Sequence, residues 1–117
     1  MLRSLLKSKI HNAAVTGTRV DYVGSITIDK ALMEASGIIP YEKVLVSDIT
    51  NGARFETYVL EGAGGVVEVN GAAAKLVKEH DRIIVMAFGL FDESEAERHK
   101  PRIVVVDGRN KVTSLLP

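Results

Sequence analysis

The stretch Y-V-G-S-I-T-I-D at residues 22–29 indicates how this chain is built. Ile26 and Ile28 alternate with polar residues, which is the period of a half-buried strand. A glycine precedes the alternation, and Asp29 follows it as a favourable N-cap for a short helix over residues 30–36. The stretch therefore predicts a short strand that is bounded on both sides.

Apolar runs of similar length, broken by glycine and asparagine, continue along the chain. We expect a first strand over residues 5–15 that is irregular near Asn12. Later strands are expected over residues 19–22, 25–28, 43–49, 54–60, 66–69, 82–90 and 102–106. The Asn-Gly pair at residues 51–52 predicts a hairpin turn, because both residue types tolerate positive φ. Short helical turns are expected over residues 72–74 and 92–98. Many short strands with few helices favour an all-β domain, a small barrel rather than an α/β sheet, and leave the strand order open.

The composition narrows the class of protein. A length of 117 residues predicts one domain, residues 1–117. Lys and Arg together number 15, as do Asp and Glu, so the charge gives no reason to expect a nucleic acid or an anionic membrane as a partner. The chain has no cysteine, which excludes a disulfide framework and a thiolate metal site. No apolar stretch has the length of a membrane span and charges interrupt the N-terminus, so we expect a soluble cytoplasmic protein.

Few of the usual catalytic patterns fit this sequence. The histidines are His11, His80 and His99, which are far apart and lack the spacing of a helical zinc pair, so no metal site is expected. No G-x-S-x-G sequence marks a nucleophile elbow, although the residue counts leave a Ser-His-Asp triad open. The glycines within residues 62–65 are not followed by Lys-Ser or Lys-Thr, which favours a hairpin turn over a phosphate loop.

Four short segments carry residues that could support chemistry, and each also has a plain structural interpretation. Lys9 and His11 share one face of the first strand, which is equally typical of a solvated strand face. Residues 22–25, Tyr-Val-Gly-Ser, are also typical of a glycine bulge within a hairpin. Neither segment alone indicates a site.

The third and fourth segments also allow both a functional and a structural interpretation. Arg54 and Tyr58 share a strand face, with Thr57 on the other face. They could bind and protonate a carboxylate substrate, or be an exposed charge and an aromatic at the edge of the core. Residues 70–74, Asn-Gly-Ala-Ala-Ala, could bring backbone N–H groups close to a ligand carboxylate, or form a tight turn before a run of helix-forming alanines.

Taken together, the four segments resemble the pyruvoyl-dependent aspartate 1-decarboxylases, bacterial lyases that make β-alanine for pantothenate. The matching sequences are K-I-H at residues 9–11, Y-V-G-S-I-T-I-D at 22–29, T-N-G-A-R-F-E-T-Y at 50–58 and V-N-G-A-A-A at 69–74. Their order and spacing agree over residues 2–112, so the set is far more specific than any one member.

The resemblance implies a fold, an assembly and an activity. The fold would be a six-stranded double-psi β-barrel with short helices, in a homotetramer with active sites between subunits. The chain would cut itself between Gly24 and Ser25 into a β chain of residues 1–24 and an α chain of residues 25–117. The activity would be loss of the α-carboxylate of L-aspartate, giving β-alanine and CO₂ for pantothenate and coenzyme A synthesis. Whether the cut is spontaneous or needs a maturation factor is left open.

The chemistry explains why such processing is needed. Loss of CO₂ leaves a carbanion that no ordinary side chain can delocalise, so the enzyme requires an electron sink. A pyruvoyl carbonyl provides one after it condenses with the substrate amine as a Schiff base. By the family mechanism, the Ser25 hydroxyl attacks the Gly24 carbonyl, the ester eliminates to dehydroalanine, and hydrolysis leaves the pyruvoyl group and ammonia. Glycine at position 24 is expected to permit a strained backbone for this attack.

The resemblance also implies roles for individual residues. Ser25 would become the pyruvoyl group, and Tyr58 would return a proton to Cα as the general acid. Lys9 and Arg54 would hold the substrate carboxylate, and Thr57 would position the scissile carbonyl and then lie near the substrate. Further substrate contacts would come from the backbone of Gly71, Ala72 and Ala73. The supporting pocket residues would be His11, Tyr22 and Asn70.

Two departures and two alternatives accompany this hypothesis. His80-Asp81 stands where family members often have Gly-Asp, so we expect a differently built turn with a solvated histidine. The tail after Lys111 is assigned nothing. A non-enzymatic β-barrel for binding or assembly is the alternative function, because a fold does not determine an activity. A PLP-dependent enzyme is disfavoured, because no lysine lies in a recognisable PLP framework and such enzymes are usually far larger.

Overall fold

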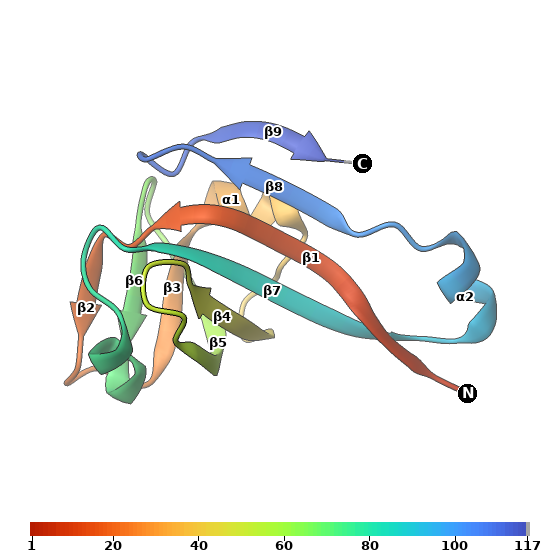
Figure 1. Ribbon diagram of the computed structural model, residues 1–117, viewed down its shortest axis with the longest axis horizontal. Coiled ribbons are helices and arrows are strands. Elements are labelled where there is room, and N and C mark those ends of the chain that lie inside the picture. The colour runs from red at the N-terminus through yellow and green to blue at the C-terminus, as the bar shows by residue number, and fades with distance from the viewer. Residues whose placement is uncertain (117) are drawn as a thin grey trace.

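The computed structural model describes residues 1–116, and strands dominate it (Figure 1). The strands are β1 (Arg3–Ala14), β2 (Gly17–Arg19), β3 (Ser25–Asp29), β4 (Lys43–Asp48), β5 (Arg54–Gly62), β6 (Val67–Asn70), β7 (Arg82–Phe91), β8 (Arg102–Val106) and β9 (Val112–Leu116). The helices are α1 (Lys30–Ser36), the 3-10 helix η1 (Gly71–Leu76) and α2 (Glu93–Arg98). The expectation of an all-β fold with short helices is confirmed.

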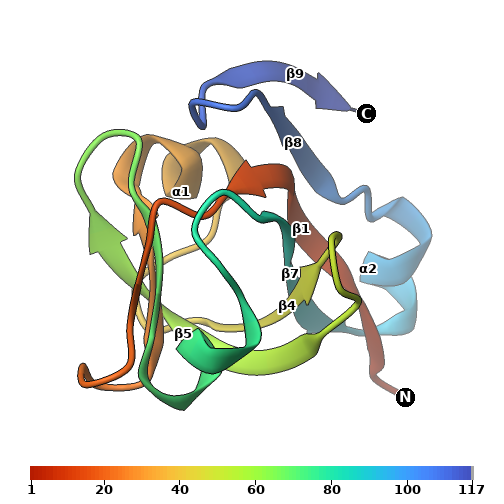
Figure 2. The same cartoon turned by 60° about the vertical axis from the view of Figure 1, so that its left-hand side comes forward.

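The strands form one sheet in the order β2-β6-β3-β5-β4-β7-β1-β8-β9. Three of the pairs are parallel, namely β2/β6, β3/β5 and β1/β8. Only Val15 and Thr16 separate β1 from β2, yet five other strands lie between these two in the order. Thr16 donates its backbone N–H to the carbonyl of Val67 in β6 at 2.8 Å. The chain thus passes directly from beside β7 to beside β6, and the sheet curls into a rounded body (Figure 2).

Several expectations about the sheet need correction. Residues 1–116 contain nine strands rather than six, and β2 and β9 at the two ends of the order are not paired with each other in that range, so these pairings do not close a six-stranded barrel. The strand expected over residues 19–22 is wrong, because β2 ends at Arg19 and Tyr22 donates back to the Arg19 carbonyl at 3.2 Å. The tail, assigned nothing from sequence, forms β9 against β8.

Two hairpin interpretations are also wrong, for the same topological reason. β2 and β3 lie on opposite sides of β6, so residues 22–25 are not a bulge within a hairpin. β5 and β6 likewise lie on opposite sides of β3, so the turn at residues 62–65 joins two strands that do not pair. The hairpin predicted at residues 51–52 is confirmed, since β4 and β5 are antiparallel neighbours and Gly52 has a φ of 76°.

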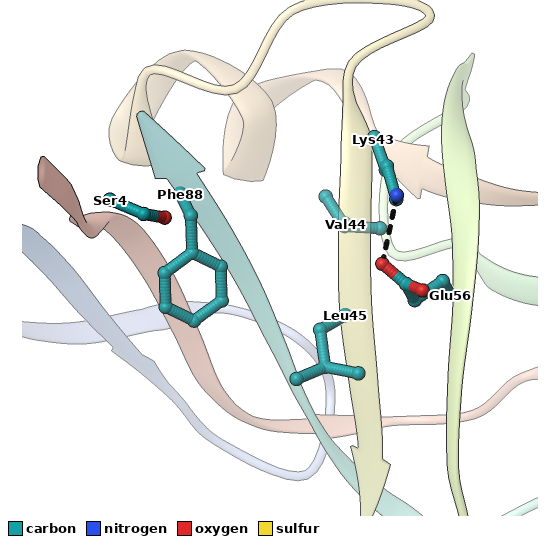
Figure 3. A pocket seen from close by; sticks show the side chains of 6 residues that line it. All are labelled: Ser4, Lys43, Val44, Leu45, Glu56 and Phe88. Atoms are coloured by element: carbon teal, nitrogen blue, oxygen red, sulfur yellow. Dashed lines mark ion pairs between the residues drawn. The ribbon is translucent and has the colours of Figure 1, made fainter. Parts of the chain in front are cut away.

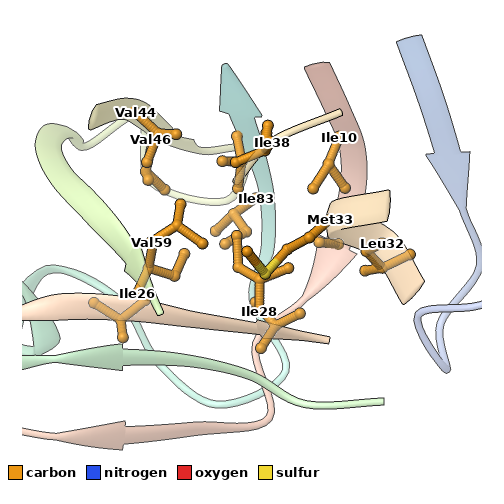
Figure 4. Packing of buried hydrophobic residues seen from close by; sticks show 14 of the residues in the cluster. Ile10, Ile26, Ile28, Leu32, Met33, Ile38, Val44, Val46, Val59 and Ile83 are labelled. Carbon is orange, nitrogen blue, oxygen red and sulfur yellow. The ribbon is translucent and has the colours of Figure 1, made fainter. Parts of the chain in front are cut away.

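Branched side chains fill the interior of the rounded body (Figure 4). Ile10, Ile26, Val46 and Val85 come from four different strands and none has measurable exposure. Helix α1 adds buried residues to the same cluster. Asp29 caps this helix by accepting the Ala31 N–H at 2.7 Å, as predicted from the sequence, and Gly37 ends it in the left-handed conformation.

Beyond the core, β1 and β7 continue as a two-stranded arm that leads to α2 (Figure 1). The irregularity expected in β1 is confirmed, because the register shifts between His11 and Ala13 and Asn12 has a φ of 73°. The capping box of Asp92 and Glu95 at the start of α2 is confirmed too.

Candidate active site

Ser25 is the first residue of β3, and its hydroxyl is enclosed. The side chain has no exposure to solvent. The hydroxyl donates to the backbone carbonyl of Val23 at 2.9 Å and accepts from the Asn70 amide at 3.0 Å. The oxygen therefore points back along the chain, to the side of the Gly24–Ser25 peptide bond.

Asn70 lies opposite Ser25 in the antiparallel β3/β6 ladder and is 1% exposed. Its Nδ2 also reaches the hydroxyl of Thr27 at 3.1 Å. Its Oδ1 is buried and accepts no hydrogen bond from any residue in the range 1–116. Leaving a buried polar atom unpaired costs about 1–3 kcal/mol, so Asn70 presents an acceptor beside Ser25 that a ligand or water would satisfy.

The backbone at Gly24 is approached closely by Gly71. Gly71 has a φ of 79°, and a Cβ added there would lie 2.5 Å from Gly24 Cα and 2.9 Å from Gly24 N. A Cβ added at Gly24 would meet nothing within 4 Å, and Gly24 is not among the glycines with positive φ. Gly24 therefore has no positive φ in the uncut chain, and the expectation that glycine permits a strained backbone during the attack stays a prediction. The conformation that requires glycine belongs to Gly71, which follows Asn70 and begins η1 as expected.

Tyr58 lies on β5, directly beside β3. Ile26 and Val59 are partners in the parallel β3/β5 ladder, so the residues before them, Ser25 and Tyr58, stand next to each other on one face of the sheet. Ser25, Tyr58 and Asn70 thus come from three neighbouring strands and share that face.

A hollow of about 310 Å³ adjoins Tyr58, and its lining residues are Lys43, Glu56, Thr57 and Tyr58. Thr57 pairs with buried Val44, while Arg54 and Glu56 are exposed, so Thr57 belongs to the opposite face, as the alternation predicted. Tyr58 is half-buried at the edge of this shallow hollow.

Lys9 and Arg54 are not brought to Ser25. Arg54 is exposed and four residues before Tyr58, which is about 13 Å along a strand. Lys9 lies on β1, and β7 and β4 separate it from β5, which is about 14 Å across the sheet. His11 shares the face of Lys9 two residues farther on. These three side chains therefore lie away from Ser25 of the same chain, Lys9 and His11 in the strand order and Arg54 along its strand.

The remaining predicted residues flank the cut site. Tyr22 is exposed, with the Arg19 guanidinium 5.0 Å from its ring centre. Ala72 and Ala73 lie in the first turn of η1, where backbone N–H groups lack partners within the helix. They directly follow Gly71, which packs against Gly24.

A second hollow, of about 300 Å³, opens on the outer face of the sheet (Figure 3). Its lining residues are Ser4, Lys43, Val44, Leu45, Glu56 and Phe88. Lys43 pairs with Glu56 at 3.0 Å, and Phe88 is 47% exposed. The register places Leu45 and Met86 in one row between Lys9 and Glu56. An apolar surface of Leu45 and Met86 therefore lies between Lys9 and Glu56.

Sequence reasoning missed Asp48, the last residue of β4. Burial raises the pKa of its carboxyl above 3.8, and a hydrogen bond with the Asp81 carboxyl raises it further. That same hydrogen bond is the main cause that lowers the pKa of Asp81. The signal was present in the sequence, because Asp48 follows Val44 and Val46 at the period of the buried face.

Other kinds of site receive no support. Across residues 1–116, no three His, Cys, Asp or Glu side chains gather in a way that could hold a metal ion. No helix of that range has the length and apolar character to cross a membrane.

Comparison with known proteins decides the family. A family model described as aspartate decarboxylase matches residues 1–113, which include all four segments. This chain belongs to the aspartate decarboxylase family. The resemblance drawn from the four segments is thereby confirmed.

Relatives of this decarboxylase family cover nearly the whole chain. The aspartate 1-decarboxylase of Pelotomaculum thermopropionicum is 50% identical over 98% of this chain and 89% of its own length. That of Caldicellulosiruptor saccharolyticus is 53% identical over 98% of this chain and 91% of its own length. That of Lactiplantibacillus plantarum is 51% identical over 97% and 88% respectively.

Proposed function

We propose that this chain is a self-processing aspartate 1-decarboxylase that removes the α-carboxylate of L-aspartate to give β-alanine. The observation that carries the proposal is the enclosed Ser25 hydroxyl, held between the Val23 carbonyl and the Asn70 amide beside the Gly24–Ser25 bond. The product would enter pantothenate and coenzyme A synthesis, the role of this family.

We propose that the hydroxyl makes the cut. Its oxygen attacks the Gly24 carbonyl carbon, the C–N bond breaks, and the acyl group moves from nitrogen to oxygen. Elimination then removes the Cα proton of Ser25 and breaks its Cβ–O bond, so that a Cα=Cβ double bond forms and residues 1–24 leave with a free carboxylate. Water finally displaces ammonia from the new terminus of residues 25–117. Asn70 supports the first step by holding the oxygen, and close packing of Gly71 restrains Gly24.

The surroundings of Ser25 fit a pyruvoyl group at this position. The Nδ2 group of Asn70 donates a hydrogen bond to the Ser25 hydroxyl oxygen and can donate equally well to a carbonyl oxygen at that position. The Oδ1 atom of Asn70 is available as a hydrogen-bond acceptor. When present, the group supplies the electron sink that loss of CO₂ requires.

Substrate binding and protonation fall to side chains around the hollow beside Tyr58. Tyr58 stands next to position 25 and is proposed as the acid that returns a proton to Cα. Thr57 lines the same hollow and is proposed to orient the Gly24 carbonyl and then the substrate. Backbone N–H groups of Gly71, Ala72 and Ala73 are proposed to bind substrate, with Tyr22 nearby.

We propose that Lys9, His11 and Arg54 act from a neighbouring subunit. Lys9 lies four strands away from Ser25 in the sheet order, Arg54 is exposed, and an apolar surface of Leu45, Met86 and the exposed Phe88 lies beside Lys9. A homotetramer with sites between subunits would bury that surface and bring a cation to each Ser25.

The finer fold proposal is a double-psi barrel formed by β1, β3, β4, β5, β6 and β7. Its support is that these six strands are consecutive in the order and that Thr16, just after β1, bonds to Val67 of β6. On this proposal β2, β8 and β9 are additions to the barrel. A cytoplasmic location is proposed from the balanced charge and the charged N-terminal region.

The activity test uses the purified chain after it has matured. Incubation with L-aspartate and no added coenzyme should yield β-alanine and CO₂ in equal amounts. A chain that binds ligands without releasing CO₂ would favour the non-enzymatic barrel. Maturation in a purified sample, compared with maturation in cell extract, separates spontaneous from assisted cutting.

A further inference from the structure

Asp48 occupies an unusual position for an acidic residue. It lies on the buried face of β4 and is 2% exposed. Its Oδ1 accepts the backbone N–H of Thr50 at 2.7 Å and that of Asn51 at 3.3 Å. Its Oδ2 is buried and receives no hydrogen bond from a donor in residues 1–116. An ionised carboxylate oxygen left in this state would be costly, because burial disfavours the charged form.

A second carboxyl group lies beside Asp48. Asp81 immediately precedes β7 and stands two residues before Ile83, which pairs with Asp48, so the register brings the side chains of Asp48 and Asp81 to the same face of neighbouring strands. A hydrogen bond between these two carboxyl groups raises the pKa of Asp48 and lowers that of Asp81. Two carboxyl oxygens attract each other only when one of them carries a proton, since an ionised carboxylate can only accept.

The surroundings indicate which residue carries the proton. Asp81 is less buried than Asp48, and its Oδ2 accepts the Lys78 backbone N–H at 3.0 Å. The Lys78 ammonium adds a favourable charge for ionised Asp81. Just after β1, Val15 donates its backbone N–H to the Asp81 carbonyl, and in the β4–β5 turn Thr50 and Asn51 donate backbone N–H groups to Asp48. The proton therefore belongs to Asp48.

We propose that Asp48 and Asp81 share one proton in the folded chain, and that this proton fixes the turn that presents Arg54. The turn runs from Asp48 to Ala53, the residue before Arg54. Besides the two bonds to Oδ1, the Asp48 carbonyl accepts the Gly52 N–H, and the Asp48 N–H donates to Ala53, both at 2.9 Å. Asp48 is thus a positioning residue, and this inference rests on the proposed role of Arg54 in substrate binding.

The proposal predicts a definite pH dependence. The folded pKa of Asp48 is raised above 3.8 by burial and by the bond with Asp81, so its stabilising contribution is present below 3.8 and is lost as the pH rises through the raised value. Above that value two carboxylates face each other and repel. The KM for aspartate should then rise on the order of tenfold, with a smaller change in kcat, because Arg54 contributes to ground-state binding.

Asp48→Asn is the decisive variant. Its amide oxygen still accepts from Thr50 and Asn51, and its Nδ2 donates to Asp81 without titrating. The melting temperature and the KM of this variant should not follow the pH change seen in the wild-type protein. Asp81→Asn is the matched control, because it removes the charged acceptor and should lower the pKa of Asp48. Wild-type pH profiles in Asp48→Asn would overturn the proposal.

A second measurement does not depend on activity. A ¹³C NMR titration of the mature wild-type protein, assigned with Asp48→Asn, should show the Asp48 carboxyl titrating above 3.8. If the Asp48 carboxyl titrates at or below that value, the proposal of a proton shared with Asp81 is overturned. If the NMR titration shows the shared proton but the KM for aspartate does not change with pH, the proposed positioning of Arg54 is overturned. Absence of aspartate turnover in the wild-type protein would count against the proposed function and leave the titration result valid.

Discussion

The proposed role of Tyr58 as proton donor can be tested separately from cleavage of the Gly24–Ser25 bond. It stands beside Ser25 on the neighbouring strand but makes none of the bonds that hold the Ser25 hydroxyl. Tyr58→Phe should therefore still cut at Gly24–Ser25, while kcat should fall by about 10²–10⁴, the usual contribution of a general acid. Gel mobility and β-alanine production measure the two effects separately. Wild-type turnover in the variant would remove Tyr58 as the proton donor.

The backbone conformation of His80 is unfavourable for a residue other than glycine, so a substitution by glycine should increase the stability of the fold. The residue is exposed and has a φ of 78°, a conformation that favours glycine. The exposed position explains why a histidine is tolerated here despite the positive φ. His80→Gly should stabilise the fold by about 0.5–1 kcal/mol, whereas Glu79→Gly, at a residue without positive φ, should not. Urea unfolding of both variants measures the difference, and equal effects would contradict the explanation.

Structural features of single residues could be predicted from the sequence where they depend on neighbouring residues. The Asp29 cap, the Asn51-Gly52 turn and the irregularity at Asn12 depend on neighbours in sequence, and all are confirmed. The contact between Gly24 and Gly71 was not predictable, because it depends on which strands pair across the sheet. The roles proposed for the site residues stay predictions.

At the scale of elements, the start of η1 and the start of β3 act as one unit. Gly71 begins η1 and lies against Gly24, with no room for a Cβ. Gly71→Ala should cost about 2–4 kcal/mol through overlap and the unfavourable φ, and should slow the cut by displacing Gly24. Gly64→Ala is the control, since a Cβ there meets nothing within 4 Å. Thermal unfolding and the rate of chain cleavage measure both effects, and equal behaviour of the two variants would contradict this unit.

The extent and type of most elements followed from apolar periodicity, but their neighbours did not. Local pattern cannot tell that β2 and β3 flank β6, or that β3 runs parallel to β5. These nonlocal pairings are what bring Ser25, Asn70 and Tyr58 to one face. The four segments predicted candidate residues, and the strand order explains how Ser25, Asn70 and Tyr58 come to share a face.

At the scale of the whole molecule, the proposed site combines residues of two subunits. Lys9 and Tyr58 lie on strands separated by two others, so a neighbouring subunit is proposed to supply Lys9. Co-expression of Lys9→Ala with Tyr58→Phe should then restore about a quarter of the wild-type activity, the fraction of neighbouring pairs that combine two intact contributors. Activity no higher than the mean of the two parent variants would indicate that Lys9 acts within its own chain.

The central claim is that the Gly24–Ser25 bond is exchanged for a carbonyl-bearing terminus. The most direct measurement is the intact mass of the purified, active protein under denaturing conditions. We predict two polypeptides, residues 1–24 with a free carboxylate and residues 25–117 with a blocked terminus that reacts with a hydrazine, and an uncut, folded, inactive chain for Ser25→Ala. Active protein that retains one intact chain with an ordinary serine at position 25 would contradict the account.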